Sequence, residues 1–365
     1  MESTPARSQR SPLATLGLLM VVLPVLIAGG YLAPSPAPLL LPAPVEALES
    51  LIRVEGTAYQ SQGHLYLTAV RMLPEPRLGQ YLLARLQPDV VVLPRDTMRV
   101  PGLSAEEQLQ LSQRLLRESC AIAEVVALRQ ANRDIKLSDP CVQVVRILPG
   151  SPALDLLRPG DIIESAGGQR VQTAAELVSI VAERLQGEGL TLRLRRGRRY
   201  ETVTVPVVPG PLDADGPVLG VMVTTSGFDY RSPVDITVDP GPIAGGTSGG
   251  LMYALGIYNA LVTEDITRGR RIAGTGSLRL NGDVGTVAGV ALKVRAAEDA
   301  AAEVFLVPED NEAAARAAAG SIKVIPVSNF RQALAAIRQL DSSGSNQRTV
   351  PASRDTTLAW MPSRR

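Results

Sequence analysis

The first extended pattern of apolar positions is an uncharged run at 13–33, LATLGLLMVVLPVLIAGGYLA. About 20 consecutive apolar residues suffice for a helix to cross a bilayer. Arg7 and Arg10 precede the run, and the next basic residue is Arg53. The positive-inside rule then predicts a cytoplasmic stub at 1–12, a single membrane anchor, and a chain that continues outside the cytoplasm. A cleaved signal peptide is the alternative interpretation, and it also exports the remainder of the chain.

Residues 34–47 and 48–138 predict a linker followed by a small αβ region. The segment APSPAPLLLPAP is rich in proline, which is typical of a semi-rigid spacer. Beyond it, LIRVEGTAY, HLYLTAVRM and DVVVLP have the apolar character of short strands. Ser104 and Glu107 form a capping box, which predicts a long helix that the pattern continues to about residue 131. The predicted apolar face of this helix carries Leu109, Leu116, Cys120 and Ala123.

Residues 139–208 predict a second unit with both strands and a helix. The strand CVQVVRIL leads into PGSPALDLLRPGDIIESAGGQRV. Thr173 and Glu176 form another capping box, and a hairpin with its turn at Gly197 joins LTLRLRR to YETVTVPVV. The predicted apolar face of the helix carries Leu177, Ile180, Val181 and Leu185.

This order of elements, together with the segments SPA, LRPGD and GG, resembles a bacterial PDZ domain. The resemblance implies that the unit binds an extended peptide by adding it to the edge of a sheet. A small packing module without a ligand is the other interpretation.

Residues 216–340 predict a third unit in which helices and strands alternate. VDITVD is a strand, and 248–262 is a helix with apolar residues at helical spacing. RIAGTGSLRLNGDVGTV is a predicted hairpin, because Asn281 and Gly282 form the favoured two-residue turn. A helix at 289–302, the strand EVFLV, a helix at 310–319, the strand IKVIPV and a last helix follow. The polar tail 341–365 has no periodicity, so we expect it to be disordered.

Composition excludes several classes of function. The chain has 365 residues and a formal net charge of +1, which gives no electrostatic footprint for nucleic acid. Apolar residues make up 45%, which argues against whole-chain disorder. One histidine, His64, and two cysteines, Cys120 and Cys141, are too few for the common zinc sites, so we expect no metal. In an oxidising compartment the two cysteines could be free or joined, and the sequence leaves both states open.

Lysine is scarce, with Lys136, Lys293 and Lys323 the only three among 37 basic residues. A lysine retained in an arginine-rich chain suggests a need for a compact amine that can lose its proton. Lys293 lies in VAGVALKVRAA among small and apolar residues, where burial would favour the neutral form. Lys323 is predicted to face solvent from an edge strand, and Lys136 lies in a polar connector.

The glycine-rich segment IAGGTSGGLMYAL places Ser248 at the start of a predicted helix. It has three interpretations. Ser248 could simply cap the helix. It could be the nucleophile of a G-x-S-x-G elbow, but that arrangement needs a later histidine, and none follows His64. It could instead use a lysine base of lowered pKa, for which Lys293 is the candidate.

IAGGTSGGLMYALGIYNAL resembles the serine segment of Lon-type proteases, and the segment from 272 to 311 resembles their lysine segment. With the PDZ-like unit and the anchor, the chain from 48 to about 335 resembles the bacterial PDZ–Lon-type proteases (the YlbL-like group). The resemblance implies that Ser248 is the nucleophile, that Lys293 is the general base and that Thr275 bonds the lysine amine. It also implies that the backbone at Gly249 and Gly246 stabilises the oxyanion.

Three residues depart from the usual family pattern. Thr247 stands where a proline usually precedes the serine, Gly249 stands where an alanine follows it, and Gly245 replaces an acidic residue that some of these sites carry. The loss of the proline loosens the loop that holds the nucleophile, whereas Gly249 retains its N–H group.

The sequence as a whole predicts an α+β protein: a transmembrane helix, a small αβ region, a PDZ domain and a Lon-type proteolytic domain. The expected function is that of a serine endopeptidase outside the cytoplasm, acting on protein or peptide substrates without a cofactor. No G-x-x-x-x-G-K-[ST] phosphate loop occurs, so no use of ATP is expected. A catalytically inactive scaffold that binds extended peptides and an enzyme that only processes itself are the alternatives. The substrate, the cleavage preference and the oligomeric state stay open.

Overall fold

The computed structural model describes residues 29–93, 104–209, 217–240 and 246–340, apart from positions 30, 32, 36, 57, 88 and 89 and the side chains of 105 and 108. Most of the predicted anchor, the stub before it and the tail from 341 lie outside the described residues. Where the chain is described, no helix is long and apolar enough to cross a membrane. The chain divides into two compact units, and Pro42–Val70 together with Arg99–Arg365 form the larger one.

The smaller unit contains a three-stranded sheet and one helix. The strand order is β5 (Val70–Leu73), β1 (Leu39–Pro42) and β6 (Val91–Val92), and the helix is α3 (Leu78–Ala84). The expected linker at 34–47 is therefore partly β structure, because Leu39 and Leu40 are buried in this sheet.

A five-stranded, mainly parallel sheet organises the C-terminal part of the larger unit. Its order is β2 (Glu46–Ala47), β4 (His64–Leu67), β18 (Arg271–Gly274), β21 (Val304–Pro308) and β22 (Lys323–Val327). The prediction that residues 271–274 form one arm of a hairpin was wrong. Ile272, Ala273 and Gly274 pair with β4 on one side and β21 on the other, and a continuously apolar segment suits such a central parallel strand.

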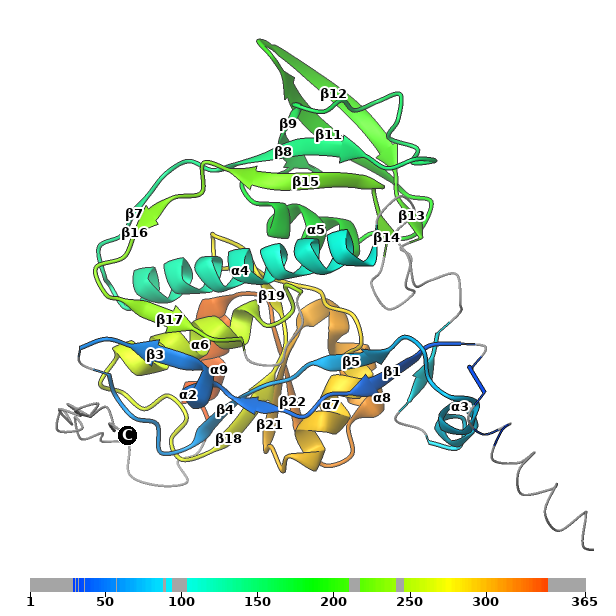
Figure 1. Ribbon diagram of the computed structural model, residues 1–365. Coiled ribbons are helices and arrows are strands. Elements are labelled where there is room, and N and C mark those ends of the chain that lie inside the picture. Colours follow the sequence, from blue (N-terminus) through cyan, green and yellow to red (C-terminus); the bar gives the residue numbers. More distant parts are fainter. Residues whose placement is uncertain are drawn as a thin grey trace, which may run out of the picture. The chain divides into compact units, whose positions relative to one another are not determined.

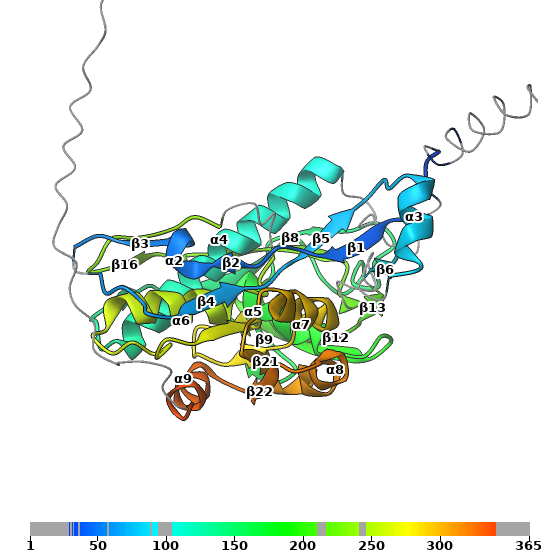
Figure 2. The same cartoon turned by 90° about the horizontal axis from the view of Figure 1, so that it is seen from below.

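Helices cover both faces of this parallel sheet (Figure 1 and Figure 2). They are α6 (Gly250–Leu261), α7 (Val290–Asp299), α8 (Glu312–Ala318) and α9 (Phe330–Arg338), close to the expected ranges. Ile272 and Leu306 pack into the core that contains α6 and α9, whereas Ala273 and Phe305 pack into the core that contains α7. Since neighbouring residues of a strand point to opposite faces, α6 and α7 lie on opposite faces of the sheet.

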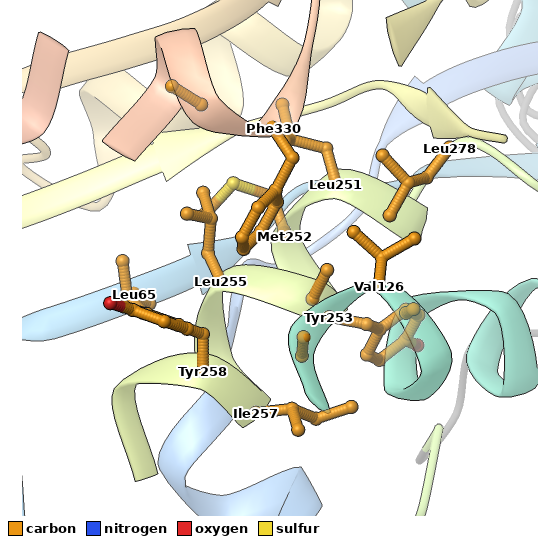
Figure 3. Packing of buried hydrophobic residues seen from close by; sticks show 14 of the residues in the cluster. Leu65, Val126, Leu251, Met252, Tyr253, Leu255, Ile257, Tyr258, Leu278 and Phe330 are labelled. Atoms are coloured by element: carbon orange, nitrogen blue, oxygen red, sulfur yellow. The ribbon is translucent and has the colours of Figure 1, made fainter. Parts of the chain in front are cut away.

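Helix α6 is buried on nearly every side. Figure 3 shows Leu251, Met252 and Leu255 of α6 gathered beside Phe330 of α9, with Val126 and Leu278 near one another. Val126 belongs to α4 (Ala105–Gln130), which begins at the predicted capping box of Ser104 and Glu107. The expected apolar face of α4 holds at Leu116 and Ala123, but Leu109 is 48% exposed because the N-terminal end of α4 extends beyond this core.

An antiparallel sheet and one helix form what we call the PDZ-like unit. The strand order is β12 (Arg199–Pro206), β11 (Gly189–Arg196), β9 (Ile162–Ala166), β8 (Cys141–Ile147) and β15 (Val221–Ser226), and β10 (Gln169–Arg170) pairs with β9. The helix, α5 (Ala174–Ala182), begins at the predicted Thr173 and Glu176 capping box. Leu185, expected on its apolar face, is exposed because α5 ends three residues earlier.

Strand β15 lies within the range 216–340 predicted for the third unit. It instead pairs along its length with β8, so it completes the PDZ-like sheet as an edge strand. The remaining elements are short: α2 (Leu48–Leu51), β3 (Ile52–Val54), β7 (Lys136–Leu137), β13 (Val208–Pro209), β14 (Pro217–Val218), β16 (Tyr230–Arg231), β17 (Ile236–Val238), β19 (Ser277–Leu278), β20 (Val284–Gly285) and the 3₁₀ turn η2 (Glu309–Asn311).

Candidate active site

Lys293 is the most unusual residue of the parallel-sheet region. It lies on the first turns of α7, and its side chain is only 2% exposed. Its neighbours along the helix, Leu292 and Val294, are also buried. Burial disfavours the charged form of an amine, and it lowers the pKa of Lys293 to about 7. The side chain is therefore a base that is partly neutral at physiological pH.

Thr275 connects Lys293 to the serine segment. It follows the carboxyl end of β18, and its main-chain N–H donates to the oxygen of Leu306 on β21. The Lys293 Nζ donates to Thr275 Oγ1 at 3.1 Å, and Thr275 Oγ1 donates to the main-chain oxygen of Ser248 at 3.0 Å. Thr275 is fully buried, so water does not compete for these bonds. The structure therefore brings all three predicted catalytic residues together at the carboxyl end of the central strand β18.

Ser248 lies one residue before the N-cap of α6, which is Gly249. The serine therefore does not cap the helix through its side chain, in contrast to the simplest of the three interpretations. Its main-chain oxygen accepts from the N–H of Gly276 at 2.8 Å as well as from Thr275. These two donors fix the peptide after the serine.

The link between serine and lysine is indirect. Among the described residues the Ser248 hydroxyl makes no hydrogen bond, to the Lys293 amine or to any other group. The two residues are connected by hydrogen bonds through the Thr275 hydroxyl, which bonds the Lys293 amine and the main-chain oxygen of Ser248. Catalytic hydrogen bonds are often long before substrate binds and shorten in the complex, so this arrangement fits a site awaiting its substrate.

The two predicted oxyanion residues differ in whether the backbone N–H group already has a hydrogen-bond acceptor. Gly246 has φ +105, a left-handed conformation suited to glycine, and its N–H donates to the oxygen of Ser112 at 3.4 Å. Its N–H is thus already engaged. The N–H of Gly249 has no acceptor in the described part of the chain and lies at the N-terminal end of α6. Of the two N–H groups, that of Gly249 is therefore the one placed to donate to an anion, at the positive end of the helix dipole.

Two supporting hydroxyls were not found from the sequence. Thr68 follows β4 and donates to the oxygen of Gly274 at 2.9 Å, which fixes the end of β18 next to Thr275. Ser119 on α4 donates to the oxygen of Thr247 at 3.3 Å. This bond restrains the loop at the position where the Lon-type proteases that the sequence resembles usually have proline. No sequence signal marks either residue, since both act across more than 100 positions.

The structure also places the two cysteines and Lys323. Cys120 and Cys141 are both free, which decides between the two states left open. Lys323 is exposed on β22, at the edge of the parallel sheet, as expected. Within the described residues, no group of three or more His, Cys, Asp or Glu side chains could hold a metal ion.

A second concave feature lies in the PDZ-like unit. An apolar groove of ≈ 180 Å³ runs between α5 and the edge strand β15. Its lining comes from α5, from the residue after β8, from the segment before and within β15, and from α4: Leu111, Leu148, Leu177, Val178, Val181, Pro217, Val218, Leu219, Gly220, Val221, Met222 and Val223. An edge strand beside an apolar groove can take up an extended peptide.

Comparisons with known proteins match parts of the chain. Over 79 residues it is 37% identical to HhoB of Synechocystis sp., a candidate serine protease, covering 21% of this chain and 18% of HhoB. Over 105 residues it is 33% identical to Lon protease 2 of Bacillus subtilis, covering 28% of this chain and 19% of that protease. The chain thus spans less than a fifth of either relative. It is similar in part to proteases, and no family model matches it.

Solved structures similar to the chain include two PDZ domains. The PDZ domain of the SdrC-like protein of Listeria monocytogenes is 22% identical, with a TM-score of 0.21, and covers 22% of this chain and 85% of that domain. The corresponding domain from Listeria innocua is 20% identical, with a TM-score of 0.21, and covers 23% and 92%.

Proposed function

We propose that the chain is an ATP-independent serine endopeptidase with a Ser248–Lys293 dyad. The observation that carries this proposal is the buried lysine. A side chain that is only 2% exposed, with its pKa lowered to about 7, donates to a hydroxyl that in turn bonds the backbone of Ser248. Among the described residues, the amine of Lys293 has no carboxylate partner. A buried lysine without such a partner is costly to the fold, so a catalytic use explains its presence.

The chemistry follows that of other lysine-assisted nucleophiles. Neutral Lys293 removes the proton of the Ser248 hydroxyl as the oxygen attacks the peptide carbonyl. The Gly249 N–H stabilises the developing oxyanion. The lysine then gives its proton to the leaving amine, and an acyl-enzyme ester remains on Ser248. Water hydrolyses the ester with Lys293 again as the base, which restores the free serine. Thr275 keeps the amine oriented throughout.

The proposed location is the outer side of a cell membrane. The uncharged run at 13–33, with Arg7 and Arg10 before it, supports a single-pass anchor whose catalytic part lies outside the cytoplasm.

The decisive test is covalent labelling. A fluorophosphonate probe should label Ser248 in the purified full-length chain, and peptide mapping should find the adduct on that residue. Labelling should be lost in Ser248→Ala and should fall about 100-fold or more in Lys293→Ala. Folding of both variants is checked by circular dichroism. A wild-type chain that stays unlabelled would remove the proposed function.

The second candidate is a scaffold that binds extended peptides without cleaving them. The apolar groove between α5 and β15 and the absence of a direct bond between Ser248 and Lys293 favour it. Incubating the full-length chain with a peptide library, and mapping products by mass spectrometry, separates the two. Cleavage that disappears in Ser248→Ala supports the enzyme, whereas binding without cleavage supports the scaffold.

In the endopeptidase the groove would help to select substrates. Val178 lines the groove and is 38% exposed, so Val178→Asp should leave the fold intact while placing a charge where apolar side chains dock. We expect KM for an unfolded protein substrate to rise about tenfold, with little change for a short peptide. Val145→Asp is the matched control, because Val145 is a similarly exposed valine of β8 outside the groove. Equal effects of both variants would argue against docking in the groove.

A further inference from the structure

Helix α5 has two faces with different partners. Leu177, Val178 and Val181 point into the apolar groove. Glu176, Ser179 and Glu183 recur at intervals of three and four residues, so they share another face of the helix and its C-cap. Each of these three bonds to the hairpin that follows Thr275, which is formed by β19 and β20.

The contact between this face and the hairpin is close and buried. Ser179 Oγ and Ser277 Oγ lie 2.9 Å apart as a hydrogen-bonded pair. Glu176 Oε1 accepts the main-chain N–H of Leu280 at 2.9 Å. The four residues that make these two bonds are each no more than 4% exposed: Ser179, Ser277, Glu176 and Leu280. A Cβ added at Gly285 would lie 1.9 Å from Ser179 Oγ, so the hairpin touches α5 without any gap.

The same hairpin begins at the catalytic residues. Ser277 is two residues after Thr275, and between them Gly276 makes two backbone bonds to the serine segment. Its N–H donates to Ser248 and its oxygen accepts from the N–H of Leu251. Only Gly276 therefore separates Ser277, which contacts α5, from the threonine that joins Lys293 to Ser248.

We propose that Ser179 and Glu176 are positioning residues, which hold the hairpin so that Thr275 stays between the lysine amine and the serine backbone. This inference rests on the proposed peptidase function. It gives the PDZ-like unit a direct part in the geometry of the dyad, in addition to any role in docking substrates. Ser179 is the cleaner of the two for a test, because Glu176 also caps its own helix through Gln172 and Thr173.

The test compares Ser179→Ala with the double variant Ser179→Ala/Ser277→Ala in the full-length chain. Removing one hydroxyl leaves its buried partner unsatisfied and can weaken the fold, whereas removing both leaves no unpaired group. We expect the double variant to unfold at nearly the same urea concentration as the wild type. Its kcat on a short fluorogenic peptide should nevertheless fall about tenfold, with KM within about twofold, because the hairpin loses the bond to α5 that lies nearest to Thr275. Thr191→Val removes another hydroxyl pair of the PDZ-like unit and should change neither constant.

Hydrogen exchange gives a second readout that does not depend on activity. Amides of the segment 275–285 should exchange about tenfold faster in the double variant, and those of β11 should be unchanged. Wild-type kcat together with unchanged exchange would overturn the positioning role. The positioning role would also be overturned if kcat fell in Ser179→Ala but returned to the wild-type value in the double variant. The loss would then come from the unpaired hydroxyl of Ser277. A wild-type chain without activity would instead remove the proposed function, and exchange would still decide whether α5 holds the hairpin.

Discussion

Lys293→Arg is expected to abolish hydrolysis at every pH, with kcat/KM reduced about 1,000-fold or more. Arginine keeps the positive charge and cannot be deprotonated in a protein, so it cannot accept the proton of Ser248. Its planar guanidinium also differs in shape from the compact amine that donates to Thr275 Oγ1. The measurement is kcat/KM on a short peptide from about pH 5 to about pH 9.

The wild-type profile over the same range is part of this prediction. Only the neutral amine acts as a base, so kcat/KM should rise with pH and reach half of its maximum near the lowered pKa of Lys293, at about 7. Lys323→Arg is the matched control. Lys323 is exposed on the edge strand β22, and its replacement should leave the profile unchanged. Activity of Lys293→Arg close to that of the wild type would rule out the lysine as the base.

Local signals in the sequence were enough to predict individual elements. Ser104 with Glu107, and Thr173 with Glu176, set the starts of α4 and α5 because a capping box depends only on residues three positions apart. The scarcity of lysine and the apolar surroundings of Lys293 likewise indicated a buried amine. The capping boxes use interactions within one turn of a helix, and the lysine inference uses only the composition and the neighbouring residues.

Sheet membership could not be predicted in the same way. Residues 271–274 were assigned to a hairpin, and the third unit was drawn to include β15, because an apolar strand has no local mark of the partner it will pair with. The hydroxyl groups that support the site could not be predicted for the same reason. Ser179 reaches Ser277, and Thr68 reaches Gly274, only after distant segments pack together. The engaged N–H of Gly246 is a further case, since its acceptor is on α4.

Burial of Lys293 should also lower the free energy of unfolding. Replacing it by a neutral side chain of similar length should raise that free energy again. The unfolded amine has a pKa of about 10.4, whereas burial lowers the folded pKa to about 7. Between these values the unfolded chain binds more protons than the folded one, so stability falls as the pH falls through this window. Below the folded pKa the loss is complete and no longer changes with pH. Lys293→Met lacks this titration and should be more stable than the wild type at neutral pH, by a few kcal/mol.

The measurement is urea unfolding of the wild type and Lys293→Met at several pH values. The difference in unfolding free energy should be largest at about pH 7 and below, and should vanish as the pH approaches about 10. Lys323→Met is the control and should show no such trend, because that side chain is exposed in the folded chain. A variant that is more stable and yet inactive would mean that the fold retains a destabilising group for its chemistry. If Lys293→Met were instead less stable at every pH, the amine would be charged and paired in the native state, and it could not serve as the base near neutral pH.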